Sequence, residues 1–259
     1  MADAYRALLS ARLRAQTSYR ASFVLDLLAN VGIGLLEFVE VYVIFHNVDV
    51  LGGLSWKEAL LVFAISNIAF SLGDLVFGHL DELPTYLRAG TLDAMLLRPL
   101  PLLGQLVTSD VSLKRLGRTA IALAVLAYAL PTAVTDWTPA KVLLVVLAPL
   151  AGAAVFGALF VCAAALQFWL VDGGEVANAF TYGGSYVSQY PTSVLHVVLR
   201  SFFTFVVPAS FVAYLPSLYL LDKDDHGLGW LSPLAALGIW LLAAAWWRGG
   251  VRRYTGAGG

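Results

Sequence analysis

The sequence predicts an all-α integral membrane protein with six transmembrane helices and with both chain ends in the cytoplasm. The first observation is composition, because 59% of the 259 residues are hydrophobic and only 13% are charged. Soluble globular domains carry about a quarter charged residues, so half of the usual charge is missing. The second observation is that the apolar residues form long runs, several of which reach the roughly 20 residues that a helix needs to cross a bilayer.

These runs define six predicted spans within a single membrane domain that covers residues 1–259. The spans are residues 23–45, 56–77, 113–133, 140–166, 194–220 and 230–247. The fourth contains small residues such as Gly152, which let helices approach closely. Pro208 and Pro216 interrupt the fifth, which is therefore predicted to be kinked or to end in a re-entrant helix.

The polar and aromatic residues 167–191 lie between the fourth and fifth spans. They are interpreted as an interfacial or cytoplasmic connection, and the sequence leaves open whether part of it is embedded in the membrane.

Lysines and arginines indicate the orientation, because cytoplasmic loops of membrane proteins carry an excess of them. With both chain ends inside, thirteen basic residues fall on the cytoplasmic side and three on the outer side. The thirteen are Arg6, Arg12, Arg14, Arg20, Arg88, Arg98, Lys114, Arg115, Arg118, Arg200, Arg248, Arg252 and Arg253, and the three are Lys57, Lys141 and Lys223. This excess favours six spans, since an odd number would place one basic chain end outside.

Residues 1–20 are predicted to form an amphipathic helix that lies in the cytoplasmic interface of the membrane. At helical spacing Leu8, Leu9 and Leu13 share one side, while arginines cover the other. The alternative is a disordered basic chain end. The stretch lacks the apolar core of a signal peptide, so no cleaved leader is expected.

The segment 78–112 separates the second and third spans and is too polar to cross a membrane. Its middle reads LRAGTLDAMLLRPLP, in which Gly90 stops one helix and a second helix begins with Asp93 in its first turn. Arg98 and Pro99 end this second helix. The segment is therefore predicted to be a cytoplasmic lever that passes force from a partner outside the membrane to the spans beside it.

The charged and the apolar residues of this lever are expected to have different roles. The charged side chains are expected to meet a soluble partner, and the apolar ones to hold the base of the short helix. The charged residues are Arg88, Asp93 and Arg98, and the apolar ones are Leu92, Met95, Leu96 and Leu97.

Polar side chains mark one side of the first span. Asn30, Glu37 and Glu40 follow Asp26 at positions i+4, i+11 and i+14, which fall within an arc of about 80°. A carboxyl group in lipid costs at least a few kcal/mol, so the stripe is expected to face protein or water. It is interpreted either as a substrate pathway or dimer seam, or as a packing stripe whose acids are paired with Arg118 or with a partner subunit.

Asn67 and Asp74 form a weaker polar face on the second span, together with Ser71. Such groups more often join helices than bind ligands, but both residues are kept as candidates for the pathway or the dimer seam.

Several function classes are disfavoured. The net charge of −1 does not fit nucleic-acid binding, which needs a basic face. The sequence has no phosphate-binding loop and no familiar catalytic motif. The single cysteine, Cys162, can neither form an internal disulfide nor build a metal site. Catalytic residues, metal ligands and cofactors are therefore not expected on this chain.

Together these features resemble the permease subunits of ABC type-2 exporters, and more narrowly a six-span bacterial branch of them. The most specific part is the pattern G-x-L-D-x-x-L-L-R-P at Gly90–Pro99. The resemblance continues in FWLVDGGEVANAFTYGGSYVSQYP and FVVPASFVAYLPSLYLL, so it covers essentially the whole chain.

The resemblance implies a permease in the bacterial cytoplasmic membrane that exports a substrate. It implies a dimer of two identical or two related permeases, docked on two ATP-binding subunits that bind the ATP and magnesium. It also implies that Gly90–Pro99 contains the coupling helix and that residues 1–20 form the connecting helix. The substrate does not follow from the resemblance.

Three other functions compete with this one. An ion-coupled secondary transporter would use Glu37 and Glu40 for proton coupling and would work without ATP. An intramembrane enzyme is disfavoured because no catalytic pair is visible. A membrane scaffold would transport nothing.

Overall fold

A computed structural model of the chain describes residue 14 and residues 20–170, 173–224 and 226–256. Within these ranges the regular structure is helical, apart from one antiparallel ribbon of two short strands, β1 (Val50–Leu51) and β2 (Leu54–Ser55). The all-α class is therefore confirmed. The predicted interfacial helix, residues 1–20, lies outside the described residues except for Arg14 and Arg20.

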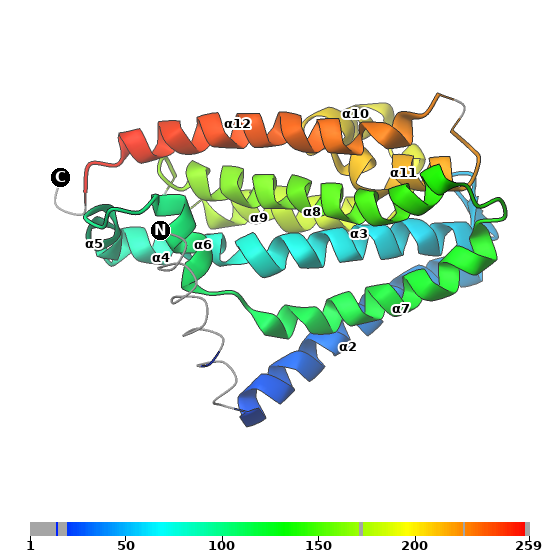
Figure 1. Ribbon diagram of the computed structural model, residues 1–259, viewed down its shortest axis with the longest axis horizontal. Coiled ribbons are helices and arrows are strands. Elements are labelled where there is room, and N and C mark those ends of the chain that lie inside the picture. The colour runs from blue at the N-terminus through cyan, green and yellow to red at the C-terminus, as the bar shows by residue number, and fades with distance from the viewer. Residues whose placement is uncertain (1–13, 15–19, 171–172, 225, 257–259) are drawn as a thin grey trace.

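Six long helices run along the length of the molecule in alternating directions (Figure 1). They are α2 (Arg20–Asn47), α3 (Trp56–Phe77), α7 (Leu116–Ala133), α8 (Pro139–Leu166), α9 (Gly174–Ser188) and α12 (Ser232–Arg253). Five helical stretches among the described residues are long and apolar enough to cross a membrane, and a bent pair would make a sixth. This fits a multi-pass membrane protein.

Short elements gather at the two ends of the bundle. One end, called the elbow end, carries η1 (Gly78–Glu82), α4 (Leu83–Arg88), α5 (Thr91–Leu96), α6 (Leu102–Ser109) and η2 (Leu113–Arg115). The half near the strands, called the ribbon end, carries η3 (Thr192–Val194), α10 (Val197–Phe205), η4 (Ser210–Tyr214), α11 (Leu215–Leu220) and η5 (Leu228–Leu231). Helix α12 ends at the elbow end.

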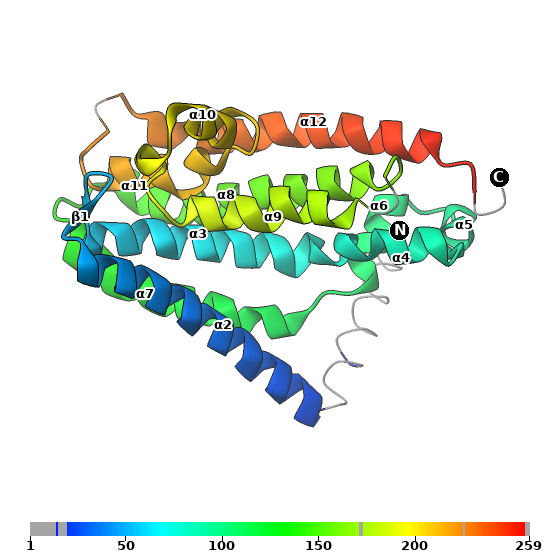
Figure 2. The same ribbon diagram turned by 180° about the vertical axis from the view of Figure 1, so that it is seen from behind.

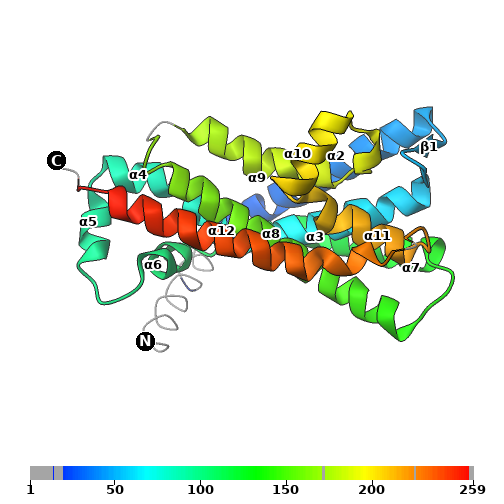
Figure 3. The ribbon, with the colours of Figure 1, turned by 90° about the horizontal axis from the view of Figure 1, so that it is seen from above.

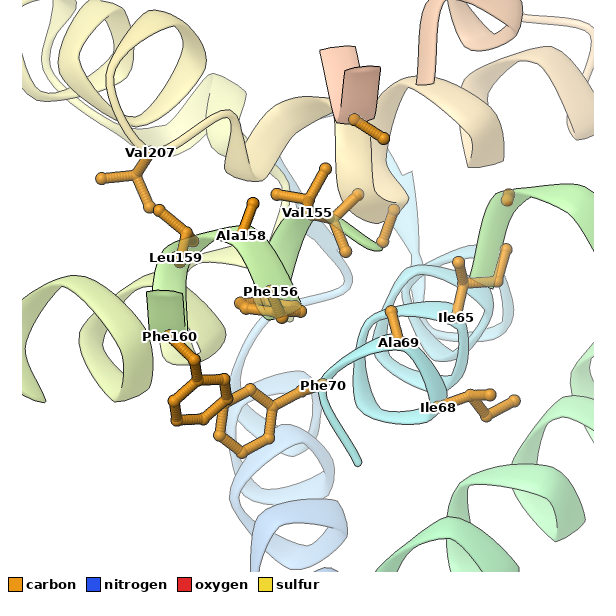
Figure 4. Packing of buried hydrophobic residues seen from close by; sticks show 14 of the residues in the cluster. Ile65, Ile68, Ala69, Phe70, Val155, Phe156, Ala158, Leu159, Phe160 and Val207 are labelled. Atoms are coloured by element: carbon orange, nitrogen blue, oxygen red, sulfur yellow. The ribbon is translucent and has the colours of Figure 1, made fainter. Parts of the chain in front are cut away.

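The core lies between α3 and α8, which pack along most of their length. Phe70 of α3 meets Phe156 of α8 edge to face, with ring centroids 5.1 Å apart, and Phe160 lies 6.1 Å from Phe70 (Figure 4). Tyr182 of α9 closes this aromatic group at 5.5 Å from Phe70. Helix α3 is apolar on nearly every side because other helices surround it.

Glycines allow the close approach of these helices. A Cβ added to Gly152 would lie 2.7 Å from Ala69 Cβ and 2.9 Å from Val212 Cγ1. A Cβ added to Gly73 would lie 2.8 Å from Phe156 Cβ. Any side chain at these positions would therefore push the helices apart.

Helix α2 departs from the bundle. Its C-terminal part lies beside α3 and α7, whereas its N-terminal end diverges from the other helices in both side views (Figures 1 and 2). Within α2 only Gly34, Glu37 and Val41 are buried. The helix therefore presents a long apolar surface that the described residues leave uncovered.

Part of the connection at 167–191 lies inside the bundle. Helix α9 runs beside α8 (Figure 3) and buries Thr181, Ser185 and Ser188. The hydroxyl of Ser188 is 2.6 Å from that of Ser66 on α3. Small and hydroxyl side chains let α9 pack closely despite its low apolar content.

The run predicted as a fifth span is broken. Val197–Phe205 and Ser210–Leu220 are bent by 73° relative to each other, which fits the kinked or re-entrant alternatives. Pro208 lies at the break, where it supplies no backbone N–H to continue the first helix.

The structure separates Arg200 from the basic residues of the elbow end, with which the sequence pattern groups it. Arg200 lies on α10, in the half of the molecule nearer the ribbon. The preceding η3 is tied to that end, since Ser193 Oγ donates to the carbonyl of Gly52 at 2.9 Å.

Replacing Gly152 with leucine should destabilise the protein, because the added side chain would collide with Ala69 and Val212. Overpacking of this kind typically costs about 1–3 kcal/mol. We expect the midpoint of thermal unfolding in detergent, followed by circular dichroism, to fall. Gly238→Leu is the matched control, since nothing lies within 4 Å of a Cβ added there. Equal midpoints for the two variants would contradict the close packing.

Candidate functional site

A network of charged side chains joins α2, α3 and α7 inside the bundle. Arg118 of α7 donates from Nε to Glu37 Oε2 of α2 at 2.9 Å, and its Nη2 pairs with the other carboxylate oxygen. The same Nε lies 3.3 Å from Asn67 Oδ1 on α3. One guanidinium group on α7 therefore connects α2 and α3. It also brings together two of the candidate residues, Glu37 and Asn67.

This network is withdrawn from solvent. The side chains of Arg118 and Glu37 are 14% and 5% exposed, and the guanidinium carbon lies 4.8 Å from the centre of the Phe70 ring. A planar cation can stack on an aromatic face while its edge binds a carboxylate in two places. Of the interpretations that the sequence leaves open for Glu37, the structure therefore shows the packing one, in which its carboxylate is paired with Arg118.

A second buried pair lies closer to the elbow end. Arg115 Nε is 3.0 Å from Asp74 Oδ2, and Arg115 Nη1 also donates to the backbone carbonyl of Asp74. A Cβ on Gly78 would overlap both the Asp74 carboxylate and the Arg115 guanidinium, so glycine leaves the space for this pair.

The sequence explains how the pairs align. Asn67 and Asp74 are seven residues apart on α3, which puts them on one side two turns apart. Arg115 ends η2 and Arg118 lies in the first turn of α7, three residues later, so they too share a side. Two cations, at the end of η2 and in the first turn of α7, thus meet two polar positions on α3.

The other two candidates on α2 do not join this network. Asn30 donates to the carbonyl of Asp26 in its own helix at 2.9 Å. Glu40 is exposed and lies in an apolar groove of about 500 Å³ between α2 and Tyr190. Asp26 forms an exposed pair with Lys114 at 3.4 Å.

The predicted lever is a folded elbow of short helices. Gly90 has a φ of +66°, a left-handed conformation that glycine adopts without strain, and it separates α4 from α5. Leu92 is fully buried and Met95 packs against the core. In contrast, Leu97 is 88% exposed and Leu96 is also exposed. The expectation that Leu96 and Leu97 hold the base of the helix is therefore wrong, because α5 ends at Leu96 and both side chains point away from the core.

Gln105, which the sequence did not single out, secures the elbow. Its amide nitrogen donates to the carbonyls of Met95 and Leu100, both at 2.9 Å. These bonds bracket the exposed loop that carries Arg98 and Pro99. A glutamine on an apolar helix gives no local sign of such a role, because its partners lie five and ten residues away.

Arg88 and Asp93 occupy different surroundings. Arg88 is exposed, and its Nε donates to the carbonyl of Pro84 at 3.3 Å. Asp93 lies beside the end of the chain, since a Cβ added to Gly256 would be 3.8 Å from either carboxylate oxygen. Burial, and then the neighbouring Asp93 carboxylate, raises the pKa of the Tyr254 hydroxyl above its ordinary value. Asp93 therefore contacts this chain's own C-terminal segment.

Comparison with known proteins gives one family. The model of a family described as ABC-2 family transporter protein matches residues 31–258. No curated protein and no solved structure matches. The matched range includes both buried pairs and the whole elbow.

Replacing Arg118 with leucine should lower the free energy of unfolding by about 3–5 kcal/mol, because Glu37 would keep a buried charge without a partner. The double variant Glu37→Leu/Arg118→Leu should recover much of this loss, since no unpaired charge remains. Thermal unfolding in detergent measures both.

Asp26→Asn is the control for that experiment, because it removes an exposed pair worth about 1 kcal/mol or less. An Arg118→Leu variant as stable as Asp26→Asn would show that the buried pair does not hold the helices together.

Proposed function

This chain belongs to the ABC-2 family of transporter proteins, and we propose that it is a permease subunit of an ATP-binding-cassette exporter in the bacterial cytoplasmic membrane. Two separate ATP-binding subunits would dock on the elbow, and they would bind the ATP and magnesium. The observation that carries this proposal is the elbow itself, which combines a rigid base with an exposed apolar tip.

The tip has the chemistry of a docking element. Leu97 is 88% exposed and stands next to the exposed Arg98 and Pro99. An apolar side chain flanked by a cation suits a groove in a soluble protein, where the leucine fills a pocket and the arginine meets an acid at the rim. Asp93 is held by the C-terminal segment, so the proposal assigns the main contact to Leu97 and Arg98.

The base of the elbow can pass force to the bundle. Helix α5 packs on α4 and α6, and both of these contact η1, which follows α3 directly. Leu92 and Leu83 are fully buried, so movement of α5 cannot be absorbed by loose side chains. The proposed route for force is therefore from Leu97 through α5 and η1 into α3.

The exposed side of α2 favours an interface with a second permease. Its apolar side chains would tolerate lipid, but the exposed carboxylate of Glu40 would not. We place Glu40 at the seam with a second permease, identical or related, or on the substrate pathway beside it.

If the ATP-binding subunit docks on the tip of the elbow, charge changes at the tip should weaken its binding and leave the fold intact. The change Leu97→Asp with Arg98→Glu puts two negative charges at the tip and should reduce copurification of the ATP-binding subunit at least about tenfold, the factor for roughly 1.4 kcal/mol. Pull-down from mild detergent, with stimulated ATP hydrolysis as a second measurement, checks this. Lys57→Glu, an exposed charge change at the ribbon end, is the control and should leave the complex intact.

Transport without ATP would contradict this proposal. If the purified chain transports under an ion gradient without ATP, and Glu40→Gln stops it, the protein is the ion-coupled secondary transporter considered above. Unchanged thermal unfolding of the Leu97→Asp/Arg98→Glu variant shows that any lost binding is not misfolding.

A further inference from the structure

A polar pocket of about 310 Å³ lies between α8, α9 and η1, apart from both buried pairs. Its polar lining comes from Asp81, Gln167, Asn178 and Tyr182, and the rest is apolar, mainly alanine. The facing helices α8 and α9 both reach this part of the bundle near α4 (Figure 3).

Asp81 gives the pocket a negative charge. Tyr182 Oη donates to Asp81 Oδ2 at 3.0 Å, and this bond leaves the other carboxylate oxygen available. The charged groups that act on Asp81 are Asp74, Glu82 and Arg115. Arg115 is already bound by Asp74, and in the described part of the chain no cation forms an ion pair with Asp81.

Gln167 provides the second and independent observation. Its residue is 3% exposed, and its Oε1 is buried without a hydrogen-bond partner among the described residues. Buried acceptors are nearly always satisfied in native proteins, so an orphan oxygen that lines a polar pocket indicates a missing donor. Asn178, which is exposed, adds an amide at the rim.

We infer that this pocket binds the primary ammonium group of a small amine. Such a group is a cation with three N–H donors, and the pocket offers the Asp81 carboxylate, Gln167 Oε1 and the Asn178 amide oxygen as acceptors. The alanine walls accept the first methylene groups of the ligand.

Other cations fit this pocket less well. A quaternary ammonium has no N–H and would leave Gln167 Oε1 unsatisfied. A divalent metal needs more charged ligands, and within the described ranges no group of three histidine, cysteine or acidic side chains could hold one. The inference goes beyond the proposed function, because binding needs neither ATP nor a transport cycle.

Thermal unfolding of the full chain in detergent tests the inference, with butylammonium chloride as the probe and tetramethylammonium chloride and potassium chloride at equal ionic strength as comparisons. We expect a saturable rise in the unfolding midpoint with butylammonium alone. Asp81→Asn should abolish the rise. Glu82→Gln, a change of the exposed neighbouring acid, should keep it.

Gln167→Leu separates loss of binding from misfolding. The ligand-free variant should unfold at a higher temperature than the parent, because the orphan acceptor is gone. Its affinity for butylammonium should fall about tenfold or more, as expected for one charge-assisted hydrogen bond. Equal responses to butylammonium and potassium, or a response that persists in Asp81→Asn, would overturn the inference.

Discussion

The architecture depends on neutralising charge inside an apolar bundle. Glu37 and Arg118 are almost fully buried, and either group alone would carry a large desolvation cost. Together with Asn67 and the Phe70 ring they form one neutral unit that touches three helices. Glu37 is the one buried charged residue of α2, so this pair helps to fix where α2 lies, together with the packing of Phe38 on Trp56 and Phe63. The Asp74–Arg115 pair repeats the arrangement nearer the elbow, with Gly78 providing the space.

Much of the fold could be predicted from local properties of the sequence. The low charge and the long apolar runs led to the all-α membrane class, which the structure and the family match support. The fifth run was harder because its prolines and the polar helix α9 break the simple pattern. There, packing of Thr181 and Ser188 against neighbours replaces hydrophobicity as the reason for burial. The separation of Arg200 from the basic residues of the elbow end was missed for the same reason, because the position of α10 depends on how the broken run folds back.

The site was predicted less completely, because its contacts join distant residues. The acids on α2 can be recognised from the sequence. The sequence does not show whether they pair with Arg118 or with a residue of a partner subunit. The role of Gln105 in the elbow had no local sign in the sequence. Nor did the sequence indicate that Asp81 and Gln167 line the same pocket. The pattern at Gly90–Pro99 indicated a lever, yet only the structure distinguishes the buried Leu92 from the exposed Leu97. Whether an ATPase binds there stays a prediction.

The contact between the C-terminal segment and Asp93 has a practical meaning. Tyr254 and Gly256 bring the end of α12 to the elbow, so the elbow is joined through the chain to α3 and α7 and also contacts the end of the last helix. If the elbow is the proposed lever, its movement would also displace the end of α12. A fluorescent label at Thr255 would therefore report directly whether the elbow moves relative to the bundle.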